Sequence, residues 1–308
     1  MAVLAAVHHG SDLMQIFETE AGASSRSQAE PGQYAIFGQP IAHSLSPRIH
    51  AAFARQFSIA VDYRSIEVAS DDFVAALAAF AERGGQGANV TLPLKQLAAR
   101  LCLSTSERAQ RADSVNTLVR QGQGWHGDST DGAGLLRDIT GRHRLYARGR
   151  RTLLLGAGGA ARAVAFALLD NGISELTIVN RTPEHADALA DAIGQPDRVH
   201  THYWNDLGNW GGFDLVVNAT SAAHAGETLD LPASLLASRA VCYDLSYGKA
   251  AFGFLAWARS VGAEHALDGL GMLVEQAAES FEIWHGKRPE TDTIYAELRA
   301  YVPGDAED

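Results

Sequence analysis

Hydrophobic residues follow two alternating spacings along most of the chain. Short strand-like runs, in which apolar residues are adjacent or alternate with polar ones, occupy residues 34–38, 61–68 and 87–93. Apolar residues three or four positions apart, which predict helices, lie between and after these runs. A series of strands separated by helices predicts a parallel or mostly parallel sheet that is covered by helices on both faces.

Polar residues mark the starts of the first predicted helices. Ser46 and Pro47 precede a pair of apolar residues that lie one helical turn apart, Ile49 and Phe53. We therefore expect Ser46 to be the N-cap and Pro47 the first helical residue. Ser70 is expected to cap a second helix in the same way. The apolar stripe of that helix consists of Phe73, Leu77 and Phe80, and a third helix is predicted for residues 95–101.

A second alternating series begins at Arg151. Its predicted strands are residues 151–156, 175–180, 213–220 and 240–247, and its predicted helices are residues 161–172 and 183–193. This order is typical of a nucleotide-binding fold. The last helical stretch, residues 271–286, is followed by no predicted strand, so we expect it to pack back onto the first domain.

Composition and charge narrow the class of protein. The 308 residues are 46% hydrophobic and 20% charged, and no run of about 18 uncharged apolar residues occurs. The start of the chain lacks the basic and then apolar blocks of a secretory signal, so we expect a cytoplasmic protein that binds no membrane. A formal net charge of -11 disfavours a nucleic-acid surface. Residues 1–32 are expected to form a mobile extension, because residues 21–33 lack periodic apolar positions.

The two cysteines, Cys102 and Cys242, lie far apart, each in an apolar run. This placement favours buried reduced thiols over a disulfide framework or a metal site. We therefore expect no structural metal, and we expect a monomer or a homodimer with a small-molecule substrate.

A glycine-rich turn stands between the strand that begins the second series and the helix that follows it. Gly156, Gly158 and Ala161 form a G-x-G-x-x-A set, which predicts that a dinucleotide binds at this turn. The first glycine allows the tight turn, and the second lets backbone N–H groups approach the pyrophosphate. The residues between and beside them, Ala157, Gly159 and Ala160, complete the expected cofactor loop.

The end of the next predicted strand favours NADP as the cofactor. An NAD site usually has Asp or Glu there to bind the ribose hydroxyls. This chain has Asn180, Arg181 and Thr182 instead, and a guanidinium can bind the 2′-phosphate of NADP. The alternative is that Thr182 only caps the next helix and that Arg181 is a solvated surface charge.

Four polar segments of the first domain lie where predicted strands end and helices begin: HSLSP, NVTLPLK, VNT and GDSTDG. Ligands of open α/β sheets bind at such positions. Ser44 and Ser46 offer hydroxyls at a helix N-terminus, a setting that suits a carboxylate, although Ser46 alone is typical of a cap.

From about Tyr34 to Tyr301 the chain resembles the shikimate dehydrogenase family. The resemblance is carried by FGQPIAHSLSP, GANVTLPLK, VNT, GDSTDGAG, GAGGAARA, NRT, NATS and DGLGMLVEQAA, in the family's order and at similar spacing. It implies an α/β fold of two domains with a cleft between them. The mostly parallel substrate domain would comprise residues 33–133 and 268–308, and the Rossmann-type NADP domain residues 134–267.

The resemblance also implies a role for individual residues. Lys95 and Asp131 would be the catalytic pair, and Ser44 and Ser46 would bind the substrate carboxylate. The residues around the substrate ring would be Thr91, Asn116, Tyr247 and Gln276. The cofactor site would comprise the glycine-rich loop together with Asn180, Arg181, Thr182, His185, Leu245 and Gly269. The implied reaction is the reversible reduction of 3-dehydroshikimate by NADPH to give shikimate, in aromatic amino acid biosynthesis through the chorismate pathway.

Each of these residues also has a structural interpretation. Lys95 follows a proline near a helix start, where a lysine is usually a solvated charge. Asp131 is placed to cap the helix that begins GAGLLRDI. Gln276 lies in the middle of a helix as a partly buried polar group, and Tyr247 is equally compatible with core packing.

Two alternative functions remain open, and the sequence departs from the family at two positions. The alternatives are a quinate/shikimate dehydrogenase that uses NAD or both cofactors, and a ligand-sensing homologue without turnover. Ser129 stands where the family often has Asn, and His185 stands where a second Arg often follows NRT. Since an imidazole loses its charge as the pH rises toward 8, the second departure predicts weaker discrimination against NAD.

Overall fold

The computed structural model describes residues 31–302. Residues 1–30 of the expected extension lie outside the described residues, and so do residues 303–308 at the end of the expected first domain. The first strand begins at Gly32. Within the described part of the chain, no helix combines the length and the hydropathy needed to cross a membrane.

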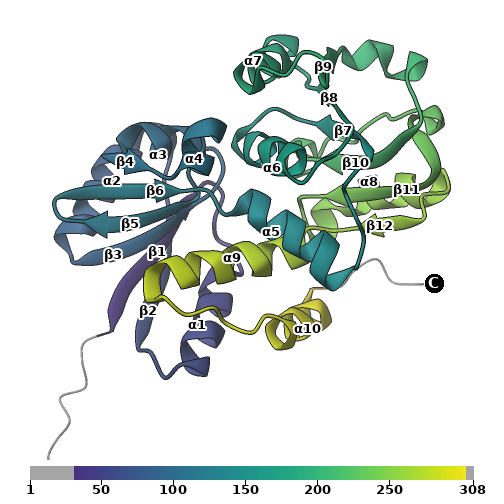
Figure 1. The fold of residues 1–308 in the computed structure, drawn as a ribbon. Coiled ribbons are helices and arrows are strands. Elements are labelled where there is room, and N and C mark those ends of the chain that lie inside the picture. The colour runs from purple at the N-terminus through teal and green to yellow at the C-terminus, as the bar shows by residue number, and fades with distance from the viewer. Residues whose placement is uncertain (1–30, 303–308) are drawn as a thin grey trace, which may run out of the picture. The chain divides into compact units, whose positions relative to one another are not determined.

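Two separate six-stranded sheets form the framework (Figure 1). The first has the order β2-β1-β3-β5-β6-β4. Its strands are β1 (Gly32–Gly38), β2 (Val61–Glu67), β3 (Gly85–Val90), β4 (Ser104–Thr105), β5 (Thr117–Gln121) and β6 (Gly124–Asp128). Strand β1 runs parallel to β2 and β3, and β4 runs parallel to β6, which confirms a mostly parallel sheet. Strand β5 is antiparallel to both β3 and β6, so the sheet also contains a hairpin that the hydrophobic pattern did not predict.

The second sheet is parallel throughout, with the order β12-β11-β10-β7-β8-β9. Its strands are β7 (Arg151–Leu155), β8 (Glu175–Val179), β9 (Val199–His202), β10 (Phe213–Asn218), β11 (Leu236–Asp244) and β12 (His265–Leu267). The predicted strands are β7, β8, β10 and β11. The two that were not predicted are the edge strands, which are short and mostly half-buried and so lack a long apolar run.

Helices cover both faces of the second sheet. The helices of the chain are α1 (Ser46–Gln56), α2 (Phe73–Glu82), α3 (Lys95–Leu101), α4 (Glu107–Ala112), α5 (Asp131–Arg137), α6 (Gly159–Asp170), α7 (Pro183–Ile193), α8 (Phe252–Ser260), α9 (Leu270–His285) and α10 (Asp292–Tyr301). Leu154 of β7 packs in one apolar cluster with α6 and α7. Its neighbours Leu153 and Leu155 point to the other face, where they pack with α8.

The predicted helix caps are wrong at two positions. Helix α1 begins at Ser46 itself and Leu45 precedes it, so Ser46 is helical rather than the cap. Its backbone N–H donates to Oγ of Ser44 at 3.3 Å, which gives Ser44 part of the capping role. Ser70 opens a turn of 3-10 helix, Ser70–Asp72, and α2 begins only at Phe73. The apolar stripe of Phe73, Leu77 and Phe80 is buried as predicted.

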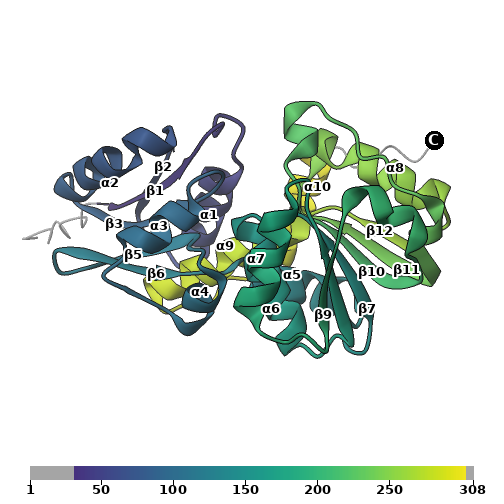
Figure 2. The ribbon, with the colours of Figure 1, turned by 90° about the horizontal axis from the view of Figure 1, so that it is seen from above.

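Helices α5 and α9 lie side by side in both ribbon views (Figures 1 and 2). Helix α9 packs against α1, as expected for the last helical stretch, and α5 packs against both α9 and α6. The close approach depends on glycine: a Cβ on Gly134 would lie 2.7 Å from Cβ of Gln276 in α9. The domain boundary expected after residue 133 falls inside α5, so this helix belongs to the packing of both sides.

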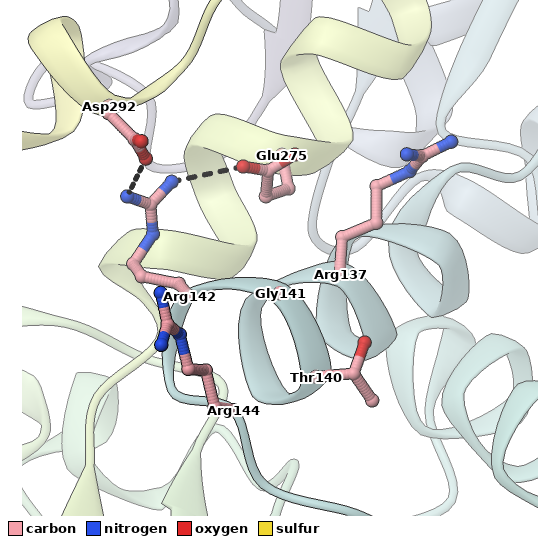
Figure 3. A pocket seen from close by; sticks show the side chains of 7 residues that line it. All are labelled: Arg137, Thr140, Gly141, Arg142, Arg144, Glu275 and Asp292. Carbon is pink, nitrogen blue, oxygen red and sulfur yellow. Dashed lines mark hydrogen bonds and ion pairs between the residues drawn. The ribbon is translucent and has the colours of Figure 1, made fainter.

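An ion-pair network, buried except at Asp292, holds the end of α5 against α9 and α10. Arg142, at the end of a turn of π-helix (Asp138–Arg142), donates to Glu275 at 3.0 Å and to Asp292 at 2.6 Å (Figure 3). It also reaches Asp138 at 3.2 Å, and the phenol of Tyr243 in β11 donates to the same carboxyl at 2.6 Å. Burial raises the pKa of Asp138, so its charge depends on these donors.

We expect Arg142→Met to lower the free energy of unfolding by about 3 kcal/mol, measured by urea denaturation. The guanidinium is largely buried, with 11% of the side chain exposed, and its removal leaves the buried carboxyls of Asp138 and Glu275 with fewer cationic partners. The control is Arg144→Met, which removes an exposed arginine two positions further along the chain (Figure 3) and should change stability by less than about 0.5 kcal/mol. Equal effects of the two variants would contradict the network's role.

Candidate active site

A cavity of about 880 Å³ lies at the carboxyl ends of strands from both sheets. The sequence-predicted residues that line it are Ser44, Ser46, Thr91, Lys95, Asn116, Asp131, Gly156, Ala157, Gly158, Ala160, Asn180, Arg181, Thr182, His185, Leu245, Tyr247, Gly269 and Gln276. Gly159 is the one predicted residue outside this lining, and it packs behind it, where an added Cβ would lie 2.9 Å from Cβ of Lys95. The structure therefore brings the predicted substrate and cofactor residues to one cavity.

A buried ion pair forms part of the cavity wall. Lys95, the first residue of α3, places its Nζ 2.5 Å from Oδ2 of Asp131. The two side chains are 12% and 5% exposed. Asp131 is the first residue of α5 and Thr130 precedes it, so the alternative role of Asp131 as the N-cap is not what the structure shows. The lysine is thus directed into the cavity rather than solvated.

Asn116 fixes the other oxygen of the aspartate. Its side-chain amide donates to Oδ1 of Asp131 at 2.9 Å and to Oε1 of Gln276 at 3.2 Å. The side-chain oxygen of Asn116, Oδ1, accepts a hydrogen bond from the backbone N–H of Thr130 at 2.8 Å. With both carboxylate oxygens bound, Asp131 can hold the lysine in one orientation.

A second polar network lies under the serines at the start of α1. Tyr63 of β2 donates its phenolic hydrogen to Oδ1 of Asn89 at 2.8 Å and is hydrogen-bonded to Ser46. The imidazole of His50 stacks on the Tyr63 ring, with 4.4 Å between ring centroids. Burial raises the pKa of Tyr63 well above its usual value and lowers that of His50 to about 3, so both groups are neutral at physiological pH. Ser46 therefore lies against a layer of uncharged side chains and is hydrogen-bonded to one of them.

The turn after β11 carries two further predicted residues. Asp244 accepts hydrogen bonds from the Ser246 backbone N–H at 2.8 Å and from the Asn218 amide at 2.8 Å. Burial raises its pKa to about 6. These bonds fix the turn that presents Leu245 and Tyr247 to the cavity. Tyr247 is half-buried and hydrogen-bonded to the backbone of Leu45.

At the far end of the cavity, β8 ends beside three polar residues. Thr182 is in the N-cap position of α7, as the alternative interpretation held, but its side chain makes no cap hydrogen bond. Arg181 is 82% exposed and pairs with Glu227 at 2.9 Å. His185 is exposed and is the third residue of α7. Neither Arg181 nor His185 is buried in the core, so both side chains are accessible to a ligand.

The sequence interpretation missed several cavity residues. Asn89 is the polar residue just before the end of β3 and stands in the GANVTLPLK segment, a signal that could have identified it. Glu227 and Asp230 lie in an irregular stretch between β10 and β11, where the sequence offers no periodic signal.

Known proteins match this chain over nearly all of its described length. The shikimate dehydrogenase (NADP(+)) of Xylella fastidiosa strain M12 is 58% identical over 276 residues, which cover 88% of this chain and 98% of the relative. The protein of the same name from Stenotrophomonas maltophilia strain R551-3 is 59% identical over 268 residues, covering 87% and 95% of the two chains. The chain belongs to the shikimate dehydrogenase family.

Family profiles and solved structures agree with this assignment. Residues 36–118 match the shikimate dehydrogenase substrate binding domain, residues 141–239 match shikimate / quinate 5-dehydrogenase, and residues 269–299 match the shikimate 5'-dehydrogenase C-terminal domain. The shikimate 5-dehydrogenase of Thermus thermophilus, solved with NADP(H) and shikimate, has a TM-score of 0.74 and 30% identity, covering 87% of this chain and 99% of that one. The two-domain α/β fold expected from the sequence is therefore that of this family.

The glycine-rich loop of this family member fits a dinucleotide. Gly156 has φ +108, and an added Cβ would lie 2.8 Å from the carbonyl oxygen of Ala219, so the fold itself requires glycine there. Gly158 has φ −74, which any residue can adopt, and an added Cβ would meet no protein atom within 4 Å. Gly158 thus leaves space open beside the N-terminus of α6, where a pyrophosphate binds in such folds.

Gly158→Ala should weaken NADP binding about tenfold while changing the free energy of unfolding by less than about 1 kcal/mol. The reason is that the added methyl group would project toward the ligand and away from the protein. Isothermal titration with NADP and urea denaturation measure the two effects. As a comparison, Gly156→Ala should lose stability, because both the backbone conformation and the space are unsuitable. Unchanged NADP affinity in Gly158→Ala would mean that the pyrophosphate does not bind this loop.

Proposed function

We propose that this chain catalyses the reversible reduction of 3-dehydroshikimate to shikimate with NADPH as the hydride donor. The observation that carries the proposal is the buried Lys95–Asp131 pair, which lies in the same cavity as the glycine-rich loop. The curated relatives at 58% and 59% identity bear the name shikimate dehydrogenase (NADP(+)), which supports the same activity here. The alternative of a ligand-sensing homologue without turnover is disfavoured, because a sensor has no need of an ion pair placed for proton exchange.

Lys95 exchanges a proton with the oxygen atom that changes between ketone and alcohol. NADPH, when bound, supplies the hydride. Reduction of the ketone places negative charge on its oxygen, and an ammonium at that position stabilises the charge and donates the proton. Asp131 accepts a hydrogen bond from Nζ at 2.5 Å and so aims the ammonium into the cavity. In the oxidation direction the same amine accepts the hydroxyl proton.

The substrate domain, residues 33–133 with 268–308, binds the ring and its carboxylate. Ser44 and Ser46, at the start of α1, are assigned to the carboxylate, because their hydroxyls line the cavity and the positive end of the helix dipole there favours an anion. The hydroxyls of the ring are assigned to Thr91, Asn116, Tyr247 and Gln276, together with Asp131, all of which line the same cavity. No metal takes part in this scheme.

The cofactor domain, residues 134–267, binds NADP along the glycine-rich loop. The loop of residues 156–160 is assigned to the pyrophosphate, and Asn180, Arg181 and Thr182 are assigned to the 2′-phosphate at the end of β8. His185, Leu245 and Gly269 complete the site. We also infer a cytoplasmic enzyme, monomeric or homodimeric, that acts in aromatic amino acid biosynthesis on the chorismate pathway.

Initial-rate kinetics with shikimate and quinate, each with NADP and with NAD, test the proposal. The expected result is the highest kcat/KM for shikimate with NADP. Comparable or higher efficiency with quinate would establish the quinate/shikimate dehydrogenase alternative. An absence of turnover with all four combinations, in protein that binds shikimate, would replace the enzyme by the ligand-sensing homologue.

Lys95→Ala should lower kcat by about 10²-fold or more, the usual scale for a lost acid–base group. Shikimate affinity should survive largely intact, since other residues bind the carboxylate and the ring hydroxyls. Steady-state rates and equilibrium titration with shikimate measure the two quantities. Lys95→Met is the matched variant, because it retains most of the side-chain volume and should lose turnover equally. Near-normal kcat in either variant would remove Lys95 from the mechanism.

His185→Arg should tighten NADP binding at pH 8 by about 1 kcal/mol and leave NAD binding little changed. A guanidinium is charged at that pH, and its planar fork can bind the 2′-phosphate through two hydrogen bonds, which an imidazole cannot do. The comparison of NADP with NAD is the internal control, because only NADP carries that phosphate. If the NADP/NAD preference at pH 8 is the same in both proteins, His185 is a solvated residue and Arg181 alone discriminates.

A further inference from the structure

The phosphate end of the cavity is poor in positive charge. Among the described residues that line the cavity, Lys95 and Arg181 are the lysine and arginine side chains. Lys95 is bound to Asp131 at the catalytic centre, so Arg181 is the cation available to a 2′-phosphate at the end of β8. The attraction of a 2′-phosphate therefore depends on whether this guanidinium is already paired with another anion.

Arg181 already has an anionic partner. Its Nη1 lies 2.9 Å from Oε2 and 3.2 Å from Oε1 of Glu227, so one nitrogen donates to both carboxylate oxygens. Glu227 follows a turn of 3-10 helix (Ala222–Ala225) in the connection from β10 to β11, and it also lines the cavity. The pair thus joins the end of β8 to the β10–β11 connection across the cofactor end of the cavity.

We infer that Glu227 is a specificity-determining residue that weakens the preference for NADP over NAD. The inference depends on the NADP site proposed above. A 2′-phosphate that binds Arg181 must displace the Glu227 carboxylate or lie beside it, and both arrangements oppose binding. The 2′-hydroxyl of NAD carries no charge and can instead donate a hydrogen bond to the carboxylate, as ribose hydroxyls do to the acidic residue of NAD sites.

The exposure of the pair limits the size of the effect. Arg181 is 82% and Glu227 is 52% exposed, and ion pairs in such solvent-accessible positions are weak. Breaking the pair should therefore change NADP affinity by roughly three- to fivefold rather than by orders of magnitude. The effect should shrink in high salt, because salt screens exposed charges.

The test is equilibrium titration of NADP and NAD with the wild-type protein, Glu227→Gln and Glu184→Gln. Glu184 is the matched control: it is an exposed glutamate in the first turn of α7, next to His185, and it does not line the cavity. Glu227→Gln should bind NADP roughly three- to fivefold more tightly and NAD no more tightly than the wild type. Glu184→Gln should leave both affinities near the wild-type values, and about 0.5 M NaCl should reduce the gain of Glu227→Gln.

Three outcomes would overturn the inference. If Glu227→Gln has the NADP affinity of the wild type, the pair does not oppose phosphate binding. If both variants gain equally, the effect is one of general charge and not of this contact. If the wild-type protein binds neither nucleotide, the proposed function fails and the inference fails with it, whereas the first two outcomes leave the proposed function intact.

Discussion

The ion pair between Lys95 and Asp131 is the interaction on which the account of this site depends. Burying a lysine and an aspartate costs several kcal/mol per ion unless both are paired and hydrogen-bonded. Here the ammonium contacts one carboxylate oxygen, and Asn116 donates to the other. Because they are paired, both charged side chains can lie in the cavity wall, whereas an unpaired lysine there would turn toward solvent.

The packing of two short helices places this pair. Lys95 begins α3 and Asp131 begins α5, so both side chains emerge where helices start at the edge of the cavity. Gly134 allows α5 to lie close to α9, and Gly159, at the start of α6, leaves room for the Lys95 side chain. A methyl group at Gly159 would press on both Lys95 and Ser114. The glycine-rich loop and Lys95 thus lie in direct contact, so the cofactor and substrate sites proposed for them would adjoin.

Much of this arrangement could be predicted from the sequence, because strongly periodic segments and polar residues at strand ends carry local signals. The regular helix of residues 183–193 and the buried stripe of α2 follow from apolar spacing alone. The start of α1 could not be fixed in this way: Ser46 resembles a cap, but it is bound to Tyr63 of a neighbouring strand, a tertiary contact that the local pattern does not contain.

The same limit applies to the candidate site. Family motifs predicted Lys95 and Arg181 as site residues, yet the ion-pair partner of Arg181 stands 46 positions further on in an irregular connection. Glu227 belongs to no periodic element, so only the folded chain reveals it. The antiparallel β5–β6 hairpin was missed for a related reason, since its polar, partly exposed strands have no continuous apolar run.

The most direct measurement of the central claim is a crystal structure of this protein with shikimate and oxidised NADP bound together. In this complex we expect Nζ of Lys95 to lie within about 3 Å of the hydroxyl that is oxidised, while Asp131 still contacts Nζ. We also expect the nicotinamide ring to lie over the carbon that bears this hydroxyl. A complex in which both ligands are bound but another side chain contacts that hydroxyl, with Lys95 turned away from it, would contradict the account.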